Sequence, residues 1–326
     1  MLALILAFYS LANAATAPDR IVRCDENIAN VINSDDKAKA TRFVLGPCTY
    51  TVSQEMRLFD GDEIVGVPGS RGMRPVRGTY PVGIKSTLQA APGVAVIVRP
   101  QGHFYTEWVR YTGADFKRSS ATGVGIAGGS MADTSQVRLS LFDLNEGAGV
   151  SNARGTFIDV EAAFNGSSAS ETFIGGGIKA TNQIHVAGGY YHDNVGNGVW
   201  CDVGCDRTSS PNGFWVHGAD LSGNTGGGVR YENAETNALI EDNHVWGNAT
   251  SKNRGGVSVR DAQNAVIRNN IFAGVGYKHN QEPDNVAIYA SDSGKSTRPN
   301  LKNIEIYPNT LNRERIKSCG GPVICY

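Results

Sequence analysis

The second half of the chain repeats one short pattern. GVRYE at Gly228 and GVSVR at Gly256 follow the same arrangement as GIKAT at Gly177 and GVWCD at Gly198. Longer segments between them, such as VHGADLSGN from Val216, alternate apolar and polar residues and close on asparagine. Recurrence at about 20 to 50 residues is the sequence signature of repeat architectures.

The repeat is too short for a propeller blade, which needs about 40 residues and four strands. Alternation within each segment indicates short β-strands. Glycine and asparagine suit the corners because both tolerate a left-handed backbone, and asparagine side chains can also stack in ladders. We therefore predict an all-β fold, a single-stranded right-handed parallel β-helix, with Gly-Gly-Val marking the corner where each coil re-enters the same sheet.

We divide the chain into four segments. Residues 1–14 form a signal peptide, 15–45 an N-terminal cap, 46–297 the β-helix, and 298–326 a C-terminal cap or tail. Within the N-terminal cap, Ile28, Val31 and Ile32 have helical spacing, which predicts a short amphipathic helix over the open end of the solenoid.

The first residues favour export. MLALILAFYSLANA is an apolar run that ends in a small-x-small cleavage pattern, although no Lys or Arg precedes it. A buried first strand is the alternative. No later segment is long and apolar enough to span a membrane. We expect a secreted protein, extracellular or periplasmic.

Six cysteines fit an oxidising compartment. Six allow fifteen pairings, and proximity along the chain favours three local disulfides. These are Cys24 with Cys48, Cys201 with Cys205, and Cys319 with Cys325.

A formal net charge of −1 gives no basic footprint for nucleic acid. The sequence does not indicate an oligomeric state.

FVLGPCTYTVSQEMRLFDGDEIVGVPG (43–69) resembles the first coil of secreted bacterial pectate-lyase-like β-helix proteins, and NGVWCDV resembles their inner coils. This family implies polysaccharide lyases, hydrolases and uronan epimerases, which bind glycans along the outside of one sheet. It leaves calcium open as a cofactor and indicates no other. The active-site motifs of polygalacturonases, pectate lyases and alginate epimerases are not recognisable.

Alternation predicts which side chains face outward. If Val199, Val229 and Val257 point inward, then Trp200, Arg230 and the residues two places further along point out. Tyr231 then points inward as core. This predicts a surface patch on three adjacent coils: Trp200, Asp202, Arg230, Glu232 and Arg260. The neighbouring sheet adds His217, Glu241 and Arg268, and the corner adds His192, Ser222 and Trp246.

The predicted function is cleavage or modification of a uronate-containing polysaccharide, with a lyase favoured over a hydrolase or an epimerase. A lyase or epimerase needs a cation that neutralises the uronate carboxylate and a base for the adjacent proton. A hydrolase needs two carboxylates. The candidate catalytic residues are His192, Asp202, His217, Arg230 and Glu232, and the candidate substrate-binding residues are Trp200, Trp215, Trp246, Glu241, Arg260 and Arg268.

The alternative is a non-catalytic glycan-binding or surface-structural β-helix. In that case the charged residues form a stabilising ladder of opposite charges. An enzyme requires the candidate residues to lie on one face, so their distribution over the faces distinguishes the two readings.

Overall fold

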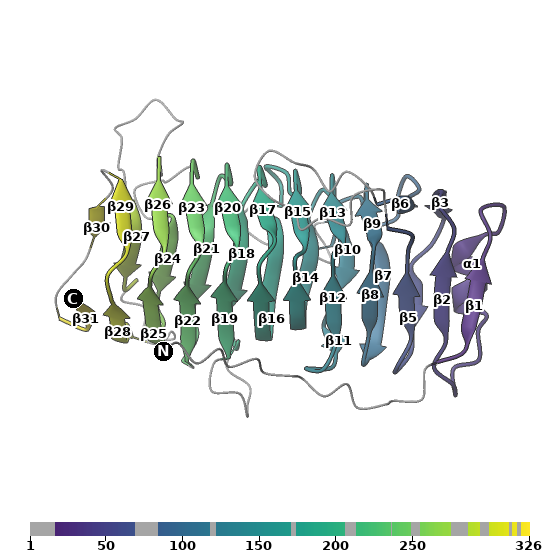
Figure 1. Cartoon of the computed structure of the whole chain (residues 1–326), viewed down its shortest axis with the longest axis horizontal. Coiled ribbons are helices and arrows are strands. Elements are labelled where there is room, and N and C mark those ends of the chain that lie inside the picture. Colours follow the sequence, from purple (N-terminus) through teal and green to yellow (C-terminus); the bar gives the residue numbers. More distant parts are fainter. Residues whose placement is uncertain are drawn as a thin grey trace, which may run out of the picture.

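The strands stack side by side along one long axis, from α1 and β1 at the purple end to β31 at the yellow end (Figure 1). The computed structural model describes residues 17–68, 84–117, 122–170, 174–205, 213–235, 237–248, 255–274, 286–293, 300–312, 315–317 and 321–326. Every strand pairing in this part of the chain is parallel, and the strands belong to a 21-stranded and a 10-stranded sheet. The predicted parallel β-helix is therefore confirmed.

Each coil contributes one strand to each of three ladders. Ladder one consists of β4 (Met56–Leu58), β7 (Val96–Gly102), β10 (Val124–Ala127), the first parts of β14 (Ala148–Ile158) and β16 (Gly176–Ala187), β18 (Asn197–Asp202), β21 (Gly227–Glu232), β24 (Val257–Arg260), β27 (Val286–Ser291) and β30 (Arg315–Lys317). The short β11 (Ser130–Met131) pairs with the end of β7.

Ladder two lies in the same sheet, because β14 and β16 run through both ladders. It consists of β1 (Asp19–Val22), β2 (Arg42–Leu45), β5 (Glu63–Val65), β8 (Tyr105–Glu107), β12 (Gln136–Arg138), the second parts of β14 and β16, β19 (Phe214–His217), β22 (Ala238–Glu241), β25 (Gln263–Arg268), β28 (Lys302–Ile306) and β31 (Val323–Cys325).

Ladder three is the 10-stranded sheet. It consists of β3 (Thr49–Val52), β6 (Ser86–Ala90), β9 (Val109–Thr112), β13 (Leu141–Asp143), β15 (Glu161–Ala163), β17 (Tyr190–His192), β20 (Asp220–Ser222), β23 (His244–Trp246), β26 (Ile271–Ala273) and β29 (Thr310–Asn312).

The ladders extend beyond the predicted limits of the β-helix at residues 46 and 297. β1 and β2 precede the first limit, and β28 to β31 follow the second, all in parallel register. These end strands keep the alternation of a strand without the Gly-Gly-Val corner that marks the central coils. The predicted signal peptide, 1–14, lies outside the described residues.

The Gly-Gly-Val corner has a steric cause. Gly227 has a φ of 114°, and a Cβ atom there would lie 2.6 Å from the carbonyl oxygen of Gly255. A side chain would meet the backbone of the next coil, so glycine is required at this turn. Other corners use a single left-handed residue after the strand, such as Asp193 at 52° and Asp242 at 54°.

Stacked asparagines stabilise two corners from within. Between ladders three and one, each side-chain amide donates to the Oδ1 of the next asparagine at 2.8 to 3.0 Å. This ladder consists of Asn145, Asn165, Asn194, Asn224 and Asn248. A second ladder of Asn243, Asn270 and Asn309, at 3.0 Å, lies between ladders two and three.

The interior is filled by the inward residues of the three ladders. Val199, Val229 and Val257 are fully buried, as is Tyr231, so the predicted inward parity is confirmed. The short helix α1 (Ile28–Asn33) buries Ile28, Ala29, Val31 and Ile32 against β3 and β4, the first strands of ladders three and one. Among the described residues, no helix is long and apolar enough to cross a membrane.

Two of the three predicted disulfides are present. Cys24 bonds to Cys48 and Cys201 to Cys205. Cys319, the predicted partner of Cys325, lies outside the described residues.

Candidate functional sites on three faces

The outward candidates divide among the three ladders. Ladder one carries Trp200, Asp202, Arg230, Glu232 and Arg260; ladder two carries Trp215, His217, Glu241 and Arg268; ladder three carries His192 and Trp246. The three residues predicted to form one patch thus stand on three ladders: His192 in the 10-stranded sheet, and Arg230 and His217 in ladders one and two of the 21-stranded sheet. Alternation tells which side chains point outward, but the direction of each face depends on the corners, and these turn the chain between strands.

The predicted register on ladder one is confirmed. Trp200 pairs with Arg230 and Asp202 with Glu232 on the next coil, and Glu232 then pairs with Arg260. Lys179, which the sequence analysis did not select, pairs with Trp200 from the other side. We call these six residues the ladder-one patch: Lys179, Trp200, Asp202, Arg230, Glu232 and Arg260.

Trp200 lies between two cations. Lys179 Nζ is 4.0 Å from the ring centroid and Arg230 Cζ is 5.1 Å from it, both within the range of a cation–π contact. The indole is 5% exposed, so it supports the cations rather than offering a free face.

Carboxylates hold the same two cations from the side. Lys179 Nζ is 2.9 Å from Asp202 Oδ2, and an Arg230 guanidinium nitrogen is 2.7 Å from Glu232 Oε1. Arg260 lies 3.9 Å from the same Glu232 oxygen. This is the arrangement of alternating charge that the structural alternative predicts.

One outward row of ladder one contains cations but no carboxylate. By strand register Arg57 pairs with Arg99, and Lys179 pairs with Trp200, which is followed on the next coils by Arg230, Ser258 and Tyr289. Glu55 contacts both Arg57 and Arg99. The outward rows of ladder two include Glu63, Glu107 and Glu241, and those of ladder three include Asp143, Glu161 and Asp220. Ladder one also carries Asp202 and Glu232, but they occupy the row beside Lys179 and Arg230, so the Lys179–Trp200–Arg230 segment presents two cations with no carboxylate between them.

Long connections border ladder one. The connection before β27 runs from Ala273 to Val286, and the one after β18 runs from Asp202 to Phe214. By contrast, β16 ends at Ala187 and β17 begins at Tyr190, so the corner between ladders two and three is tight.

The ladder-two cluster is built around stacked rings. His185 lies parallel to Trp215 with the ring centroids 4.3 Å apart, and His185 Nε2 is 2.8 Å from His217 Nε2. Burial and the neighbouring His217 lower the pKa of His185 to about 4. Because one nitrogen of this pair must donate and the other accept, a neutral pair satisfies the contact.

Glu241 orders the other side of the ladder-two cluster. It accepts hydrogen bonds from Trp215 Nε1 at 3.1 Å and from Arg268 Nε at 2.8 Å. Trp215 and Arg268 thus have fixed orientations.

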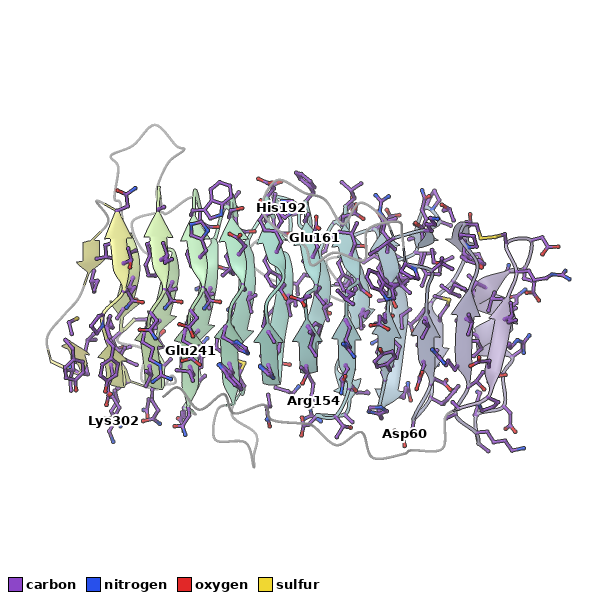
Figure 2. The ribbon with its side chains drawn as sticks, in the orientation of Figure 1. Asp60, Arg154, Glu161, His192, Glu241 and Lys302 are labelled. Atoms are coloured by element: carbon purple, nitrogen blue, oxygen red, sulfur yellow. A yellow bond between two sulfur atoms is a disulfide. The ribbon has the colours of Figure 1, made fainter. Side chains whose placement is uncertain are left out.

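The ladder-three cluster is the most buried of the three. His192 contacts Glu161 Oε1 at 3.0 Å and Asp193 Oδ2 at 2.8 Å, and its ring stacks on Tyr190 at 3.8 Å. Glu161 is fully buried and His192 is 4% exposed. Figure 2 shows the two side chains together near one edge of the stack, with Glu241 well away from them.

The pKa values of both Glu161 and His192 are raised. Burial raises the pKa of Glu161, and the hydrogen bond and charge of His192 oppose that shift. For His192, burial lowers the pKa, but the hydrogen bonds and charges of Asp193 and Glu161 outweigh burial and raise it. Both ring nitrogens are occupied, so His192 presents no free nitrogen to a substrate.

Trp246 lies one coil beyond Ser222, as predicted, and Ser222 one coil beyond His192. The Trp246 Nε1 donates to Asp220 Oδ1 at 2.9 Å.

In the described part of the chain, no group of three or more His, Cys, Asp or Glu residues is arranged to hold a metal ion.

Strand register alone could have identified Lys179. It is the third residue of GIKAT, and Trp200 is the third residue of GVWCD in the next coil. His185 pairs with Trp215 on the next coil, so strand register could also have identified it. Glu161 carries no sequence signal, because an outward glutamate on a strand is ordinarily solvated.

No protein-family model matches the chain, and no curated protein matches it. Among solved structures, it is similar to the A-module of the Azotobacter vinelandii mannuronan C-5 epimerase AlgE4, at 14% identity and a TM-score of 0.50, over 92% of this chain and 94% of the other. It is also similar to the A-module of AlgE6 from the same organism, at 16% identity and a TM-score of 0.48, over 92% and 93%. Pectate lyase Pel9A matches at 14% identity and a TM-score of 0.40, over 93% of this chain and 73% of the other. At such identities the likeness concerns the fold, which is the predicted pectate-lyase-like parallel β-helix.

Proposed function

We propose that this chain binds an acidic, uronate-containing polysaccharide along the outer face of ladder one. The observation that carries the proposal is the pair of cations Lys179 and Arg230, which flank Trp200 in one outward row of ladder one with no carboxylate in the row between them. One solved structure of similar fold belongs to an enzyme named for mannuronan, which is itself a polysaccharide.

The spacing of the cations suits a polymer that lies along the helix axis. Lys179 and Arg230 are two coils apart, or roughly 9.6 Å at about 4.8 Å per strand. A chain crossing β16, β18 and β21 can therefore bring carboxylates to both cations in turn. Arginine binds a carboxylate through two parallel N–H groups, which adds orientation to the charge contact.

Ion pairs within the protein hold these two cations in fixed positions before a ligand arrives. Asp202 and Glu232 approach from the adjacent outward row and hold the ammonium and guanidinium groups over Trp200. An arriving uronate adds a partner to groups that are already ordered, which reduces the entropy lost on binding.

A second candidate function is lyase-type cleavage of the same polymer, favoured by the Lys179–Arg230 pair. Arg230 stays protonated and neutralises the uronate carboxylate, whereas a lysine can lose its proton and serve as a base. Asp202 and Trp200 hold Lys179 as an ammonium, so Lys179 would first give a proton to Asp202. It would then take the C5 proton as the C4–O bond breaks and a C4–C5 double bond forms, and water would protonate the leaving oxygen. Of the histidines that the sequence suggested as bases, His192 lies on ladder three and His217 on ladder two.

We also propose that the protein is exported. Two disulfides in the described residues are typical of proteins from oxidising compartments. A polysaccharide outside the cell is the partner that this location offers.

Calorimetric titration with polygalacturonate and alginate tests the binding proposal. We expect salt-sensitive binding by the wild type and a loss of tenfold or more in Lys179→Gln/Arg230→Gln. Arg154→Gln is the matched control, because it removes a half-buried cation that is paired with Asp133 away from the ladder-one patch. No binding of either polymer, or equal binding by all three proteins, would overturn the proposal.

Ultraviolet absorbance of unsaturated products separates the two functions. Products from the wild type that disappear in Lys179→Arg, while binding persists, support the lyase. Binding with no unsaturated product leaves the protein as a binding module.

A further inference from the structure

The outer face of ladder two contains a hollow that no function proposed above uses. It has a volume of about 400 Å³, within the size range of small-ligand sites. Leu239, Val266 and Glu305 line it as successive residues of one outward row on adjacent coils, and Asn264 and Asn303 also line it.

Trp215 precedes these residues in the same outward row, because it pairs with Leu239. The ring centroids of His185 and His217 lie 4.3 and 4.5 Å from that of Trp215, yet only 5.0 Å from each other. Rings on opposite faces of the indole would be nearly twice as far apart, so both imidazoles cover the same face. His185 lies on the preceding coil, so the other face of the indole turns toward Leu239 and the hollow.

The polar groups around the hollow are held in place. Asn303 Nδ2 donates to Asn264 Oδ1 at 2.9 Å, and Asn264 Nδ2 donates to the Glu235 carbonyl oxygen at 2.8 Å. Glu305 Oε2 accepts a hydrogen bond from the Tyr307 hydroxyl at 2.6 Å. Groups with fixed positions bind a ligand without a further loss of entropy.

The charge of the lining indicates the kind of ligand. Among the described residues that line the hollow, Glu305 is the single ionisable group and none is a cation. An acidic sugar would meet an uncompensated carboxylate, which disfavours it. A neutral sugar can place its apolar C–H face on an aromatic and aliphatic floor, while its hydroxyls donate to a carboxylate and to amide oxygens.

We propose that the strip formed by Trp215, Leu239 and Val266, followed by Glu305 in the same row and lined by Asn264 and Asn303, is a second carbohydrate site that binds a neutral oligosaccharide. Three coils span roughly 9.6 Å between the first and last strand, which is about the length of two pyranose units. The chain then lies along the helix axis on a face other than ladder one, and the two sites are independent.

Saturation-transfer NMR with cellohexaose, mannohexaose and hexagalacturonate tests this site. We expect transfer to at least one neutral oligosaccharide, and an affinity at least tenfold lower in Trp215→Ala and Val266→Arg. Val266 is half-buried and points outward, so the arginine can extend into solvent without disturbing the core. Thr156→Arg is the matched control, because Thr156 occupies the same outward row two coils before Trp215.

The outcomes separate this site from ladder one. Neutral binding that survives Lys179→Gln/Arg230→Gln but is lost in Val266→Arg supports the second site, whatever hexagalacturonate does. Failure of both neutral oligosaccharides to bind overturns it. Neutral binding that is unchanged in Val266→Arg, or that Thr156→Arg weakens equally, also overturns it.

Discussion

Replacing Asn224 by alanine measures what an internal asparagine ladder contributes to this fold. The Asn224 side chain is fully buried. Its Nδ2 donates to the Tyr191 carbonyl oxygen and to Asn248 Oδ1, both at 2.9 Å. Its Oδ1 accepts from the backbone nitrogen of Asn194 at 3.2 Å and from Asn194 Nδ2 at 2.8 Å.

The expected cost follows from these four contacts. Each hydrogen bond contributes a net ~1 kcal/mol, which gives about 4 kcal/mol in total. Partners left buried without a replacement add about 1–3 kcal/mol more, because alanine cannot satisfy them and water has no access. We expect Asn224→Ala to lower the free energy of unfolding by roughly 5 kcal/mol, a large share of the ~5–15 kcal/mol typical of a domain.

Asn309 provides a matched control at the end of the second asparagine ladder. It also makes four side-chain hydrogen bonds, to the carbonyl oxygens of Ile267 and Tyr307 and from both nitrogens of Asn270. Asn309 is only half-buried, so water can replace its side chain. We expect Asn309→Ala to cost about 1–2 kcal/mol.

Urea titration followed by circular dichroism, with disulfides intact, gives both values. Equal losses in the two variants would refute the argument from burial. A loss below about 1 kcal/mol for Asn224→Ala would refute the assigned role of the ladder.

Two further predictions concern a corner and a buried ion pair. Gly227→Ala should lower the free energy of unfolding by more than about 2 kcal/mol, because the added Cβ strains the backbone and clashes with the next coil. Gly247 has a φ of 58° and nothing within 4 Å of an added Cβ, so Gly247→Ala should lower it by about 1 kcal/mol. Equal urea midpoints for the two variants would contradict this prediction. Asp193 and Glu161 raise the pKa of His192 in the folded protein. The stabilisation of the fold by protonated His192 is therefore complete below its pKa in the unfolded chain, about 6.5, and is lost as the pH rises through its pKa in the folded protein. His192→Gln should therefore show a flatter fall in thermal midpoint as the pH increases from about 6, and a profile parallel to the wild type would contradict the pairing.

The sequence was sufficient to predict the coils and their register. The positions of Val199, Val229 and Val257 set the parity, and the glycines before them set the phase of each coil. The prediction that Trp200 lies beside Arg230 on the next coil followed from these two facts.

The joint catalytic patch could not be predicted in the same way. His192, His217 and Arg230 all point outward, but each follows a different corner of its coil. Whether two outward side chains share a face depends on the corners between them, and alternation does not report corner geometry.

The burial of some outward side chains could not be predicted from the sequence either. Trp200 and Glu161 point away from the interior, yet they are almost fully covered by neighbouring coils and side chains. That cover depends on contacts between coils, such as the stacking of Lys179 and Arg230 on Trp200.

A crystal structure of the protein with bound hexagalacturonate would show directly where an acidic oligosaccharide lies on the β-helix. We predict an oligosaccharide that crosses β16, β18 and β21 on the outer face of ladder one, with uronate carboxylates against Lys179 and Arg230. An acidic oligosaccharide bound on ladder two or three, with these two cations unchanged in their contacts to Asp202 and Glu232, would contradict the account.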